Sequence, residues 1–302
     1  MKILVTGHRG LLGSACVRRF SKRHEVLAIN TTLFDDRYVR FWFAEHQPDA
    51  VVHCAAKVGG VGANREHPVN FLIDNLTIQN IVMQAASDYG VKKFINIGTS
   101  CMYPDNAPVP VKETSLLTGP FNPDVAAYAV AKLAGYQLGR AFRDQYGKHF
   151  VTAVPCNLYG PGDNYGPSAH VIPALFKRMA DCERDQKSLS VWGDGSAVRE
   201  FLHSDDAASA LETVLDRYDG PELINLGTGH STSIAELVRL MCAITGFSGN
   251  VRWDISKPTG VQTKTLDVSK LSALGWAPSL SLFQGLSSTW EDFTTNPCQR
   301  YK

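Results

Sequence analysis

Several features of membrane, metal-binding and secreted proteins are missing from this sequence of 302 residues. It has no stretch of eighteen apolar residues, and the short apolar run after Met1-Lys2 is too brief for a signal peptide or a membrane span. Its seven cysteines form no CxxC pair, which argues against a zinc site, and their odd number argues against a disulfide framework. We therefore expect a protein of the reducing cytoplasm that binds no metal.

A strong charge of either sign is missing too. The chain has 30 Lys and Arg against 29 Asp and Glu, a net charge of +1, so neither nucleic acid nor an anionic membrane is an expected partner. A local basic cluster can still bind a small phosphorylated ligand. Low-complexity tracts and internal repeats are also absent, and the length suits one large domain with a smaller lobe.

Apolar runs of strand length alternate with helical patterns along the chain. Several runs are nearly continuous in Val, Ile, Leu and Phe, as is typical of a parallel sheet buried on both faces. The expected strands are Lys2–Thr6, Glu25–Ile29, Ala50–Cys54, Lys93–Ile97, Phe150–Val154, Leu189–Val191 and Glu222–Leu226. The expected helices are Leu11–Lys22, Arg37–His46, Pro68–Tyr89, Val125–Tyr146, His170–Asp181 and Asp205–Arg217. This alternation predicts an α/β fold with a Rossmann-type doubly wound parallel sheet.

Beyond residue 160 the pattern is looser. Segment 160–200 is rich in Gly, Pro and Asn and is predicted to consist of loops around one helix. Further helical segments are expected at Ser233–Gly246, Lys270–Leu274 and Leu282–Phe293. We expect residues 1–160, with returning segments near 186–228, to form the dinucleotide-binding Rossmann domain. Residues 161–302 would mainly form a smaller α+β C-terminal lobe that binds the substrate.

A glycine-rich turn follows the first expected strand. The residues of this turn and of the helix that follows it are Gly7, His8, Arg9, Gly10, Leu11, Leu12 and Gly13. Glycines let the backbone turn tightly and approach a pyrophosphate, and the helix N-terminus offers free N–H groups. An ordinary strand–turn–helix connection is the alternative, but the position after the first strand predicts a dinucleotide-binding loop.

The end of the second expected strand bears on the choice between NAD and NADP. An NAD site usually has a carboxylate there for the ribose 2′-hydroxyl, whereas this strand ends Ala28-Ile29-Asn30-Thr31-Thr32. Arg9 is either a solvated surface charge or a guanidinium that binds a 2′-phosphate. Both observations favour NADP(H) as the cofactor.

A tyrosine and a lysine four residues apart are the candidate proton-transfer pair. Tyr128 and Lys132 would lie on one face of a helix. The lysine charge should lower the pKa of the phenol, which makes Tyr128 a candidate acid or base for a carbonyl or alcohol oxygen. Tyr89 and Lys93 have the same spacing, but Gly90 between them marks a helix end, so these two need not share a face. The alternative for Tyr128 and Lys132 is an exposed pair without a catalytic role.

Polar residues follow the fourth expected strand. After Lys93–Ile97 the chain reads Gly98-Thr99-Ser100-Cys101-Met102-Tyr103, at the carboxyl edge of the sheet where ligands bind in doubly wound folds. Thr99 is placed to hydrogen-bond a reacting oxygen beside Tyr128. A hydrolase nucleophile elbow would read GxSxG, and Met102 excludes it.

In combination, these segments resemble the extended short-chain dehydrogenases/reductases and, within them, the GDP-L-fucose synthase family. The resemblance runs from Gly7 to about Trp290. The matching segments are GHRG at Gly7–Gly10, AAKVGG at Ala55–Gly60, TSCMYP at Thr99–Pro104, YAVAK at Tyr128–Lys132, NLYGP at Asn157–Pro161, HVIPAL at His170–Leu175, REFLHSDD at Arg199–Asp206 and LGW at Leu274–Trp276. So many ordered matches are far more specific than any one motif.

The resemblance implies a two-stage reaction on a GDP-sugar, GDP-4-keto-6-deoxy-D-mannose. Carbons C3 and C5, next to the ketone, are first epimerised by proton exchange. The C4 ketone is then reduced with NADPH while the tyrosine protonates O4. It also implies a homodimer, formed through the helices Pro68–Tyr89 and Val125–Tyr146, and no metal.

Two further residues gain roles from the resemblance. Inversion needs one group that removes a proton and another that returns one, and the family assigns these roles to the positions matching Cys101 and His170. Cysteine and histidine both exchange protons near neutral pH. The enolate formed in between would accept hydrogen bonds from Tyr128 and Thr99. By residue type alone, Cys101 is equally a small buried apolar residue, and His170 a helix-cap or core histidine.

The resemblance also implies binding contacts. Cofactor contacts are implied for Ile97, Gly98, Thr99, Ser100, Lys132, Pro155, Cys156, Asn157, Leu158 and His170. Substrate contacts are implied for Arg178, Trp192, Arg199 and Lys257. Arginine suits a diphosphate because its guanidinium can donate two parallel hydrogen bonds to phosphate oxygens, and tryptophan can cover a ring face. Each of these charges would otherwise be an ordinary surface group.

The sequence departs from the family pattern twice, and other functions stay open. The family usually has Ser where Thr99 stands, and a longer second-strand loop with a basic residue. A related GDP-sugar 5-epimerase/4-reductase acting on a 3,6-dideoxy sugar would look similar near Cys101 and His170. A 4,6-dehydratase is disfavoured because it needs acid/base carboxylates after the hydroxyl residue. A non-catalytic NADP-sensing protein should have lost Tyr128 or Lys132, and both are present.

Overall fold

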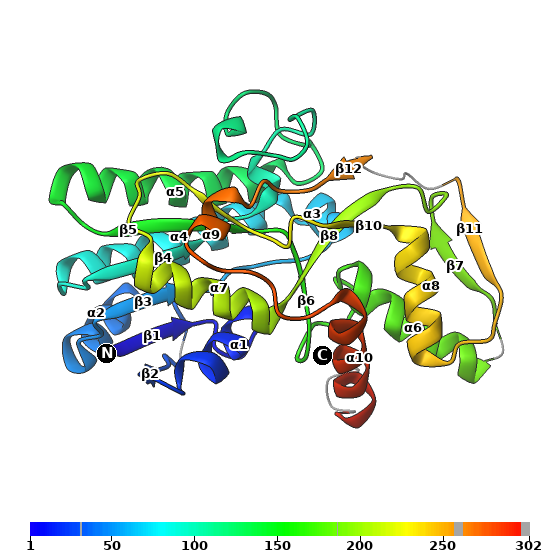
Figure 1. The fold of residues 1–302 in the computed structure, drawn as a ribbon. Coiled ribbons are helices and arrows are strands. Elements are labelled where there is room, and N and C mark those ends of the chain that lie inside the picture. The colour runs from blue at the N-terminus through cyan, green and yellow to red at the C-terminus, as the bar shows by residue number, and fades with distance from the viewer. Residues whose placement is uncertain (31, 186, 257–261, 297–302) are drawn as a thin grey trace.

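Six parallel strands form the larger sheet of the molecule. The structure is a computed structural model that describes residues 1–30, 32–185, 187–256 and 262–296 of the chain. Its strands are β1 (Lys2–Thr6), β2 (Glu25–Leu27), β3 (Ala50–His53), β4 (Lys93–Ile97), β5 (Phe150–Pro155) and β9 (Ile224–Leu226). They lie in the order β2-β1-β3-β4-β5-β9, and every pair is parallel (Figure 1). The predicted fold class is confirmed.

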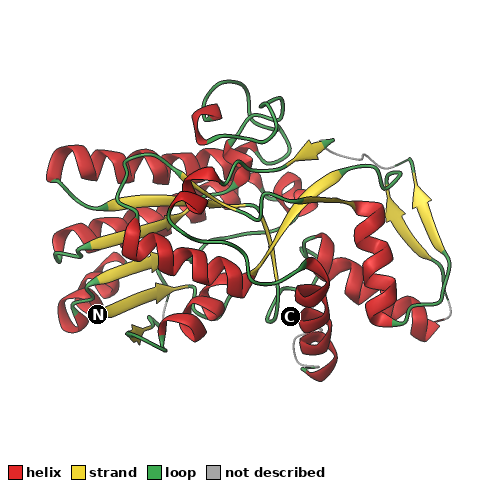
Figure 2. Ribbon diagram, in the orientation of Figure 1, coloured by secondary structure: helices red, strands yellow, loops and turns green. Residues whose placement is uncertain are grey.

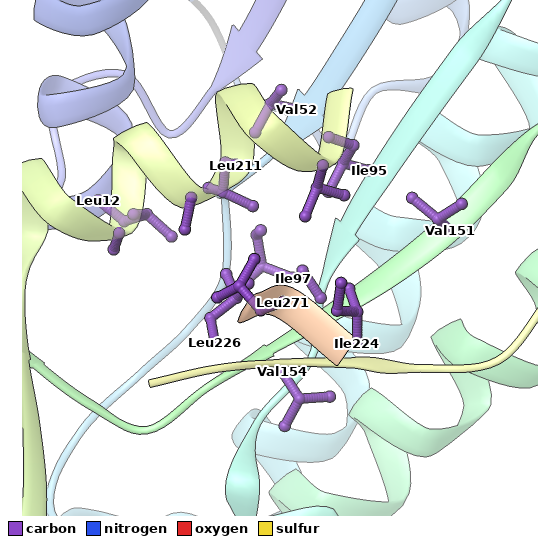
Figure 3. Packing of buried hydrophobic residues seen from close by; sticks show 14 of the residues in the cluster. Leu12, Val52, Ile95, Ile97, Val151, Val154, Leu211, Ile224, Leu226 and Leu271 are labelled. Atoms are coloured by element: carbon purple, nitrogen blue, oxygen red, sulfur yellow. The ribbon is translucent and has the colours of Figure 1, made fainter. Parts of the chain in front are cut away.

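Helices cover both faces of this sheet. One face carries α1 (Leu11–Phe20), α7 (Ser204–Arg217) and α9 (Ser269–Ala273); the other carries α2 (Asp36–His46), α4 (Pro68–Asp88) and α5 (Ala126–Tyr146). Side chains alternate along each strand, so Ile3 and Val5 enter the core beneath α1 and α7 while Leu4 enters the opposite one. Figure 3 shows part of the first core, including Val52. Among the described residues, no helix is long and apolar enough to cross a bilayer.

The strand order reverses beside β1. From β1 the chain moves to β2 on one side and then to β3 on the other, so the loops after β1 and β3 diverge. In doubly wound sheets such a point leaves a crevice at the carboxyl ends of the strands, where ligands bind. The glycine-rich turn lies there.

A second lobe is built around β8 (Val198–His203), as Figure 2 shows. Its neighbours are β10 (Ser231–Ser233), β12 (Thr263–Lys264) and β6 (Asn157–Tyr159), while β7 (Leu189–Trp192) pairs with β11 (Val251–Asp254). The helices α6 (Val171–Asp185), α8 (Ile234–Thr245) and α10 (Leu282–Thr295) enclose a third core. The short helix α3 (Val61–Glu66) precedes α4.

The prediction of loops around one helix for segment 160–200 was incomplete, because strand β8 begins at Val198, inside this segment. Within β8, the Glu200 carboxylate is fully buried and accepts hydrogen bonds from the backbone N–H groups of Gly229 (2.7 Å) and Leu266 (2.8 Å). Of the segment near 186–228, helix α7 packs on the larger sheet and strand β9 extends it, whereas β7 pairs with β11 in the second lobe.

Candidate active site

The glycine-rich turn after β1 packs against main chain that leaves no room for side chains. Gly7 has φ +66°, and a Cβ there would lie 2.8 Å from the Ala55 nitrogen. A Cβ on Gly13 would lie 2.1 Å from the Gly7 oxygen, so only glycine lets α1 approach this closely. Gly10 stands at the N-cap of α1 and has no side chain to cap it. The first N–H groups of α1 are therefore available to an external anion.

A hollow of about 260 Å³ opens beside this turn. The residues that line it are Gly7, His8, Arg9, Ile29, Asn30, Leu33 and Ala55. The Arg9 guanidinium lies at its edge and donates a hydrogen bond of 3.4 Å to the Asn30 side chain, and none of these lining residues carries a carboxylate. The close glycine backbone, the uncapped helix and this hollow fit a dinucleotide with its adenosine end at Arg9.

Tyr128, Thr99 and Cys101 come together at the carboxyl end of β4. Tyr128 is in the first turn of α5 and interacts with the Thr99 side chain by a hydrogen bond and with Cys101 electrostatically. The Thr99 hydroxyl oxygen accepts a hydrogen bond from the Cys101 N–H (3.3 Å) and so orients the short helix Ser100–Met102. The ring of Phe71 meets the Tyr128 ring edge-on at 6.0 Å.

The expected lowering of the Tyr128 pKa is wrong for this structure. Burial raises the pKa of the phenol well above its usual range, Cys101 raises it further, and the bond to Thr99 offsets this only in part. Lys132 does not reverse the effect because its Nζ lies 6.0 Å from the ring centre and donates to the Ile97 carbonyl oxygen (2.9 Å). Burial also lowers the pKa of Lys132 to about 8. Tyr128 is thus a neutral phenol, which can donate a proton.

His170 lies at the start of α6, where its carbonyl oxygen accepts a hydrogen bond from Ala174. Solvent reaches the imidazole, but the surrounding protein removes enough hydration to lower its pKa. The preceding segment is tied to the turn after β3, since the Gly60 N–H donates to the Ser168 oxygen (3.0 Å). That turn also lies against Phe71, which contacts Tyr128.

Several predicted cofactor residues have side chains that point into the core. Leu12, Ile97, Pro155 and Cys156 are buried, so a cofactor would meet their backbone only. Leu11 and Leu158 are half-buried; Asn157 is exposed and donates to the Glu200 carbonyl oxygen (2.8 Å).

Three of the four predicted substrate residues, Arg178, Trp192 and Arg199, lie on the second lobe. Trp192 ends β7 with 62% of its surface exposed, and Arg178 is half-buried on α6. Arg199 is half-buried on β8, and burial lowers the pKa of its guanidinium despite the charge of Asp105. In the described part of the chain no carboxylate forms an ion pair with Arg199, so it is available to an anion. Lys257 lies outside the described residues.

Asn75 and Phe71 on α4 are positioning residues that sequence reasoning missed. Asn75 bonds the Lys57 backbone twice, through the Lys57 N–H and carbonyl oxygen, both at 3.0 Å, and so fixes the turn after β3. The AAKVGG match indicated that the turn after β3 is functional, but it gave no sign that Asn75 and Phe71 on α4 hold this turn in place. Within the described ranges, His, Cys, Asp and Glu gather in no group of three that suits a metal.

Comparison with known proteins identifies the family. Residues 3–227 match the model of the NAD dependent epimerase/dehydratase family. The chain belongs to this family. It is therefore an enzyme of the nicotinamide-dependent epimerase and reductase type, as predicted.

Several relatives that are similar over nearly the whole chain have names of GDP-sugar enzymes. The chain is 43% identical to GDP-L-fucose synthase 1 of Arabidopsis thaliana over 99% of its own length and 95% of that protein's. It is 33% identical to GDP-L-colitose synthase of Yersinia pseudotuberculosis over 97% and 98% of the two chains. Its fold matches a GDP-L-fucose synthetase from Naegleria fowleri bound to NADP with a TM-score of 0.91 and 29% identity, covering 100% of this chain and 96% of the other.

Proposed function

We propose that this enzyme is a GDP-L-fucose synthase, which converts GDP-4-keto-6-deoxy-D-mannose to GDP-L-fucose. The observation that carries the proposal is the cluster of Tyr128, Thr99 and Cys101 beside a dinucleotide-binding turn. A plain dehydrogenase needs the phenol and the hydroxyl but not the thiol. The 43% identity to a GDP-L-fucose synthase over nearly the whole chain supports the same assignment.

The proposed roles follow from the protonation states of these groups. Cys101 and His170 exchange the protons on C3 and C5, one removing a proton and the other returning one on the opposite face. The lowered pKa keeps His170 neutral at pH 7 and able to accept a proton. Thr99 and Tyr128 hydrogen-bond the O4 oxygen as enolate charge develops, and Tyr128 finally donates its proton there. Bound NADPH would supply the hydride for C4.

We propose NADP(H) as the cofactor, held at the phosphates by the turn Gly7–Gly13 and by the N-terminus of α1. Support comes from the Naegleria fowleri structure with bound NADP and from Arg9 at the edge of a hollow that has no lining carboxylate among the described residues. Lys132, which donates to the Ile97 carbonyl oxygen, would lie near the nicotinamide end.

Replacing Arg9 with Ala should weaken NADPH binding about tenfold and NADH binding less than about twofold, because only NADPH offers a 2′-phosphate to the guanidinium. The two dissociation constants can be measured by fluorescence titration. The exposed Arg37, in the first turn of α2, provides the matched control, and Arg37→Ala should bind both cofactors normally. An equal loss for both cofactors in Arg9→Ala would show that Arg9 does not select the phosphate.

We further propose that the second lobe binds the GDP-sugar through Arg178, Trp192, Arg199 and Lys257. Arg199 supports this best, since a half-buried guanidinium without a carboxylate partner in the described chain suits a diphosphate. Residues 1–160 with α7 and β9 would then hold the cofactor, and residues 161–302 would mainly hold the GDP-sugar.

A homodimer in the cytoplasm is the proposed state of the enzyme. The helices α4 and α5 pack side by side, and they expose the apolar residues Val69, Ile73 and Val130, which a second copy would cover. The six cysteines of the described residues are all free thiols, which suits a reducing compartment.

A related activity on a 3,6-dideoxy sugar is the second candidate, supported by the 33% identity to a GDP-L-colitose synthase. A panel of GDP-4-keto-6-deoxymannose and its 3-deoxy counterpart, each with NADPH, separates the two. We expect a higher kcat/KM for the 3-hydroxy substrate. A preference for the 3-deoxy sugar would overturn the proposed function.

A further inference from the structure

Two cysteines that have no place in the proposed reaction interact beneath the dinucleotide-binding turn. Cys16 lies on α1 with none of its surface exposed, and Cys54 directly follows β3 and is half-buried. Because side chains alternate along a strand, Cys54 shares the face of Val52, which packs in the core beneath α1 and α7. Both cysteines pack in the same hydrophobic core, and their thiol side chains interact directly.

The surroundings of the two thiols differ in a way that assigns them different roles. Cys54 is half-buried and can be reached by solvent, whereas none of the Cys16 surface is exposed. Cys16 is enclosed, and burial together with the contact to Cys54 raises its pKa well above the usual range. Cys54 is therefore the thiol that reacts with an oxidant, and Cys16 is the resolving thiol that then forms the disulfide.

We propose that Cys16 and Cys54 are a redox-modifiable thiol pair that a peroxide converts to a disulfide. In the first step the Cys54 sulfur attacks one peroxide oxygen, the O–O bond breaks, and Cys54 becomes a sulfenic acid as the other oxygen leaves as water. In the second step the Cys16 sulfur attacks the Cys54 sulfur, the S–O bond breaks, and the hydroxyl leaves as water with the Cys16 proton. The two thiols lose two electrons in total, and the peroxide gains them.

The disulfide would change the dinucleotide site, because both cysteines adjoin it. The Cys54 carbonyl carbon lies 3.0 Å from the Cβ position of Gly7, and Ala55, the next residue, lines the hollow at Arg9. An S–S bond of about 2.05 Å is much shorter than any contact between separate thiols, so it draws the end of β3 toward α1. The glycine-rich turn packs so closely on α1 that it cannot move further inward, since a Cβ on Gly13 would lie only 2.1 Å from the Gly7 oxygen. Oxidation is therefore expected to weaken cofactor binding.

The test treats the reduced full-length protein with hydrogen peroxide and maps the thiols by tryptic mass spectrometry. Cys16 falls in peptide 10–18, Cys54 in peptide 41–57 and Cys101 in peptide 94–112, so the three are read separately. We expect peptides 10–18 and 41–57 to become cross-linked. NADPH binding, measured by fluorescence titration, should weaken about tenfold in the cross-linked protein, and dithiothreitol should reverse both changes.

Single-cysteine variants give the controls. In Cys16→Ala, peroxide should leave a sulfenic acid on peptide 41–57, which dimedone traps, and NADPH affinity should be unchanged. In Cys54→Ala, peptide 10–18 should stay reduced. Cys242→Ala, which removes a half-buried thiol on α8, should behave as the parent protein.

The proposal is overturned if peptide 41–57 resists peroxide, if it cross-links to a peptide other than 10–18, or if the linked protein binds NADPH as tightly as before. None of these readouts needs the sugar substrate or turnover, so they do not depend on the proposed function.

Discussion

Replacing Tyr128 with Phe is expected to reduce NADPH oxidation by about three orders of magnitude, because the O4 oxygen loses its proton donor. The donor role rests on the raised pKa of this phenol, which keeps it protonated through neutral and mildly alkaline pH. Proton exchange at C3 and C5 should survive in part, since Thr99 still hydrogen-bonds the developing enolate. The rate is measured by the absorbance of NADPH with GDP-4-keto-6-deoxymannose.

Tyr89 offers a control within the same sequence pattern. It is followed by a lysine at the same spacing, but it lies at the end of α4 with 38% of its surface exposed, and Lys93 donates to the Tyr218 carbonyl oxygen instead. Tyr89→Phe should oxidise NADPH at the parent rate. Near-normal activity in Tyr128→Phe, or a similar loss in both variants, would reject the assigned role.

Replacing Cys101 with Ser or His170 with Asn should lower solvent proton exchange at C3 and C5 by at least about a hundredfold. Serine matches cysteine in size and asparagine is somewhat smaller than histidine, and neither replacement exchanges protons as a thiol or an imidazole does. Exchange is followed in deuterated water without NADPH, so that reduction does not interfere. Controls are Cys242→Ser and the exposed His230→Asn, both on the second lobe and both expected to exchange normally. Full exchange in both test variants would refute the epimerase assignment.

The pH dependence of this exchange gives a second reading of His170. The surrounding protein removes part of the hydration of the imidazole and so lowers its pKa. The neutral form therefore persists below pH 6.5, and the base is lost only when the pH falls through the lowered value. The acid limb of the exchange rate should therefore lie below pH 6.5, and His170→Asn should lose it. An acid limb at or above pH 6.5 in the parent enzyme would contradict this role.

Most elements around the larger sheet could be predicted from the sequence because each has a clear pattern of its own, a continuous apolar run for a strand or a helical period for a helix. Helix α5 was expected at Val125–Tyr146 and is found at Ala126–Tyr146, and strand β4 was expected and is found at Lys93–Ile97. The second lobe was less predictable, since β6, β10 and β12, which pair with β8, are only two or three residues long and show no apolar run. Nothing near Glu200 in the chain indicates that its carboxylate is buried and bound by distant backbone.

The candidate site was also only partly predictable from the sequence. Tyr128 and Lys132 were predicted from a helical spacing, and a strand end predicted Thr99 beside them. The direction of the Tyr128 pKa was not predictable, because it depends on burial and on Lys132 turning to the Ile97 carbonyl oxygen. His170 stands at the start of α6, where its backbone also suits the helix-cap interpretation, so only its chemistry can decide its role.

The central claim is that this enzyme inverts two carbons before it reduces a third, and one reaction in deuterated water tests it directly. The purified protein is incubated with GDP-4-keto-6-deoxymannose and NADPH, and the product is analysed by NMR and mass spectrometry. The account predicts GDP-L-fucose with deuterium at both C3 and C5 and hydrogen from the cofactor at C4. A reduced sugar that retains hydrogen at C3 or C5, or that keeps the manno configuration there, would contradict it.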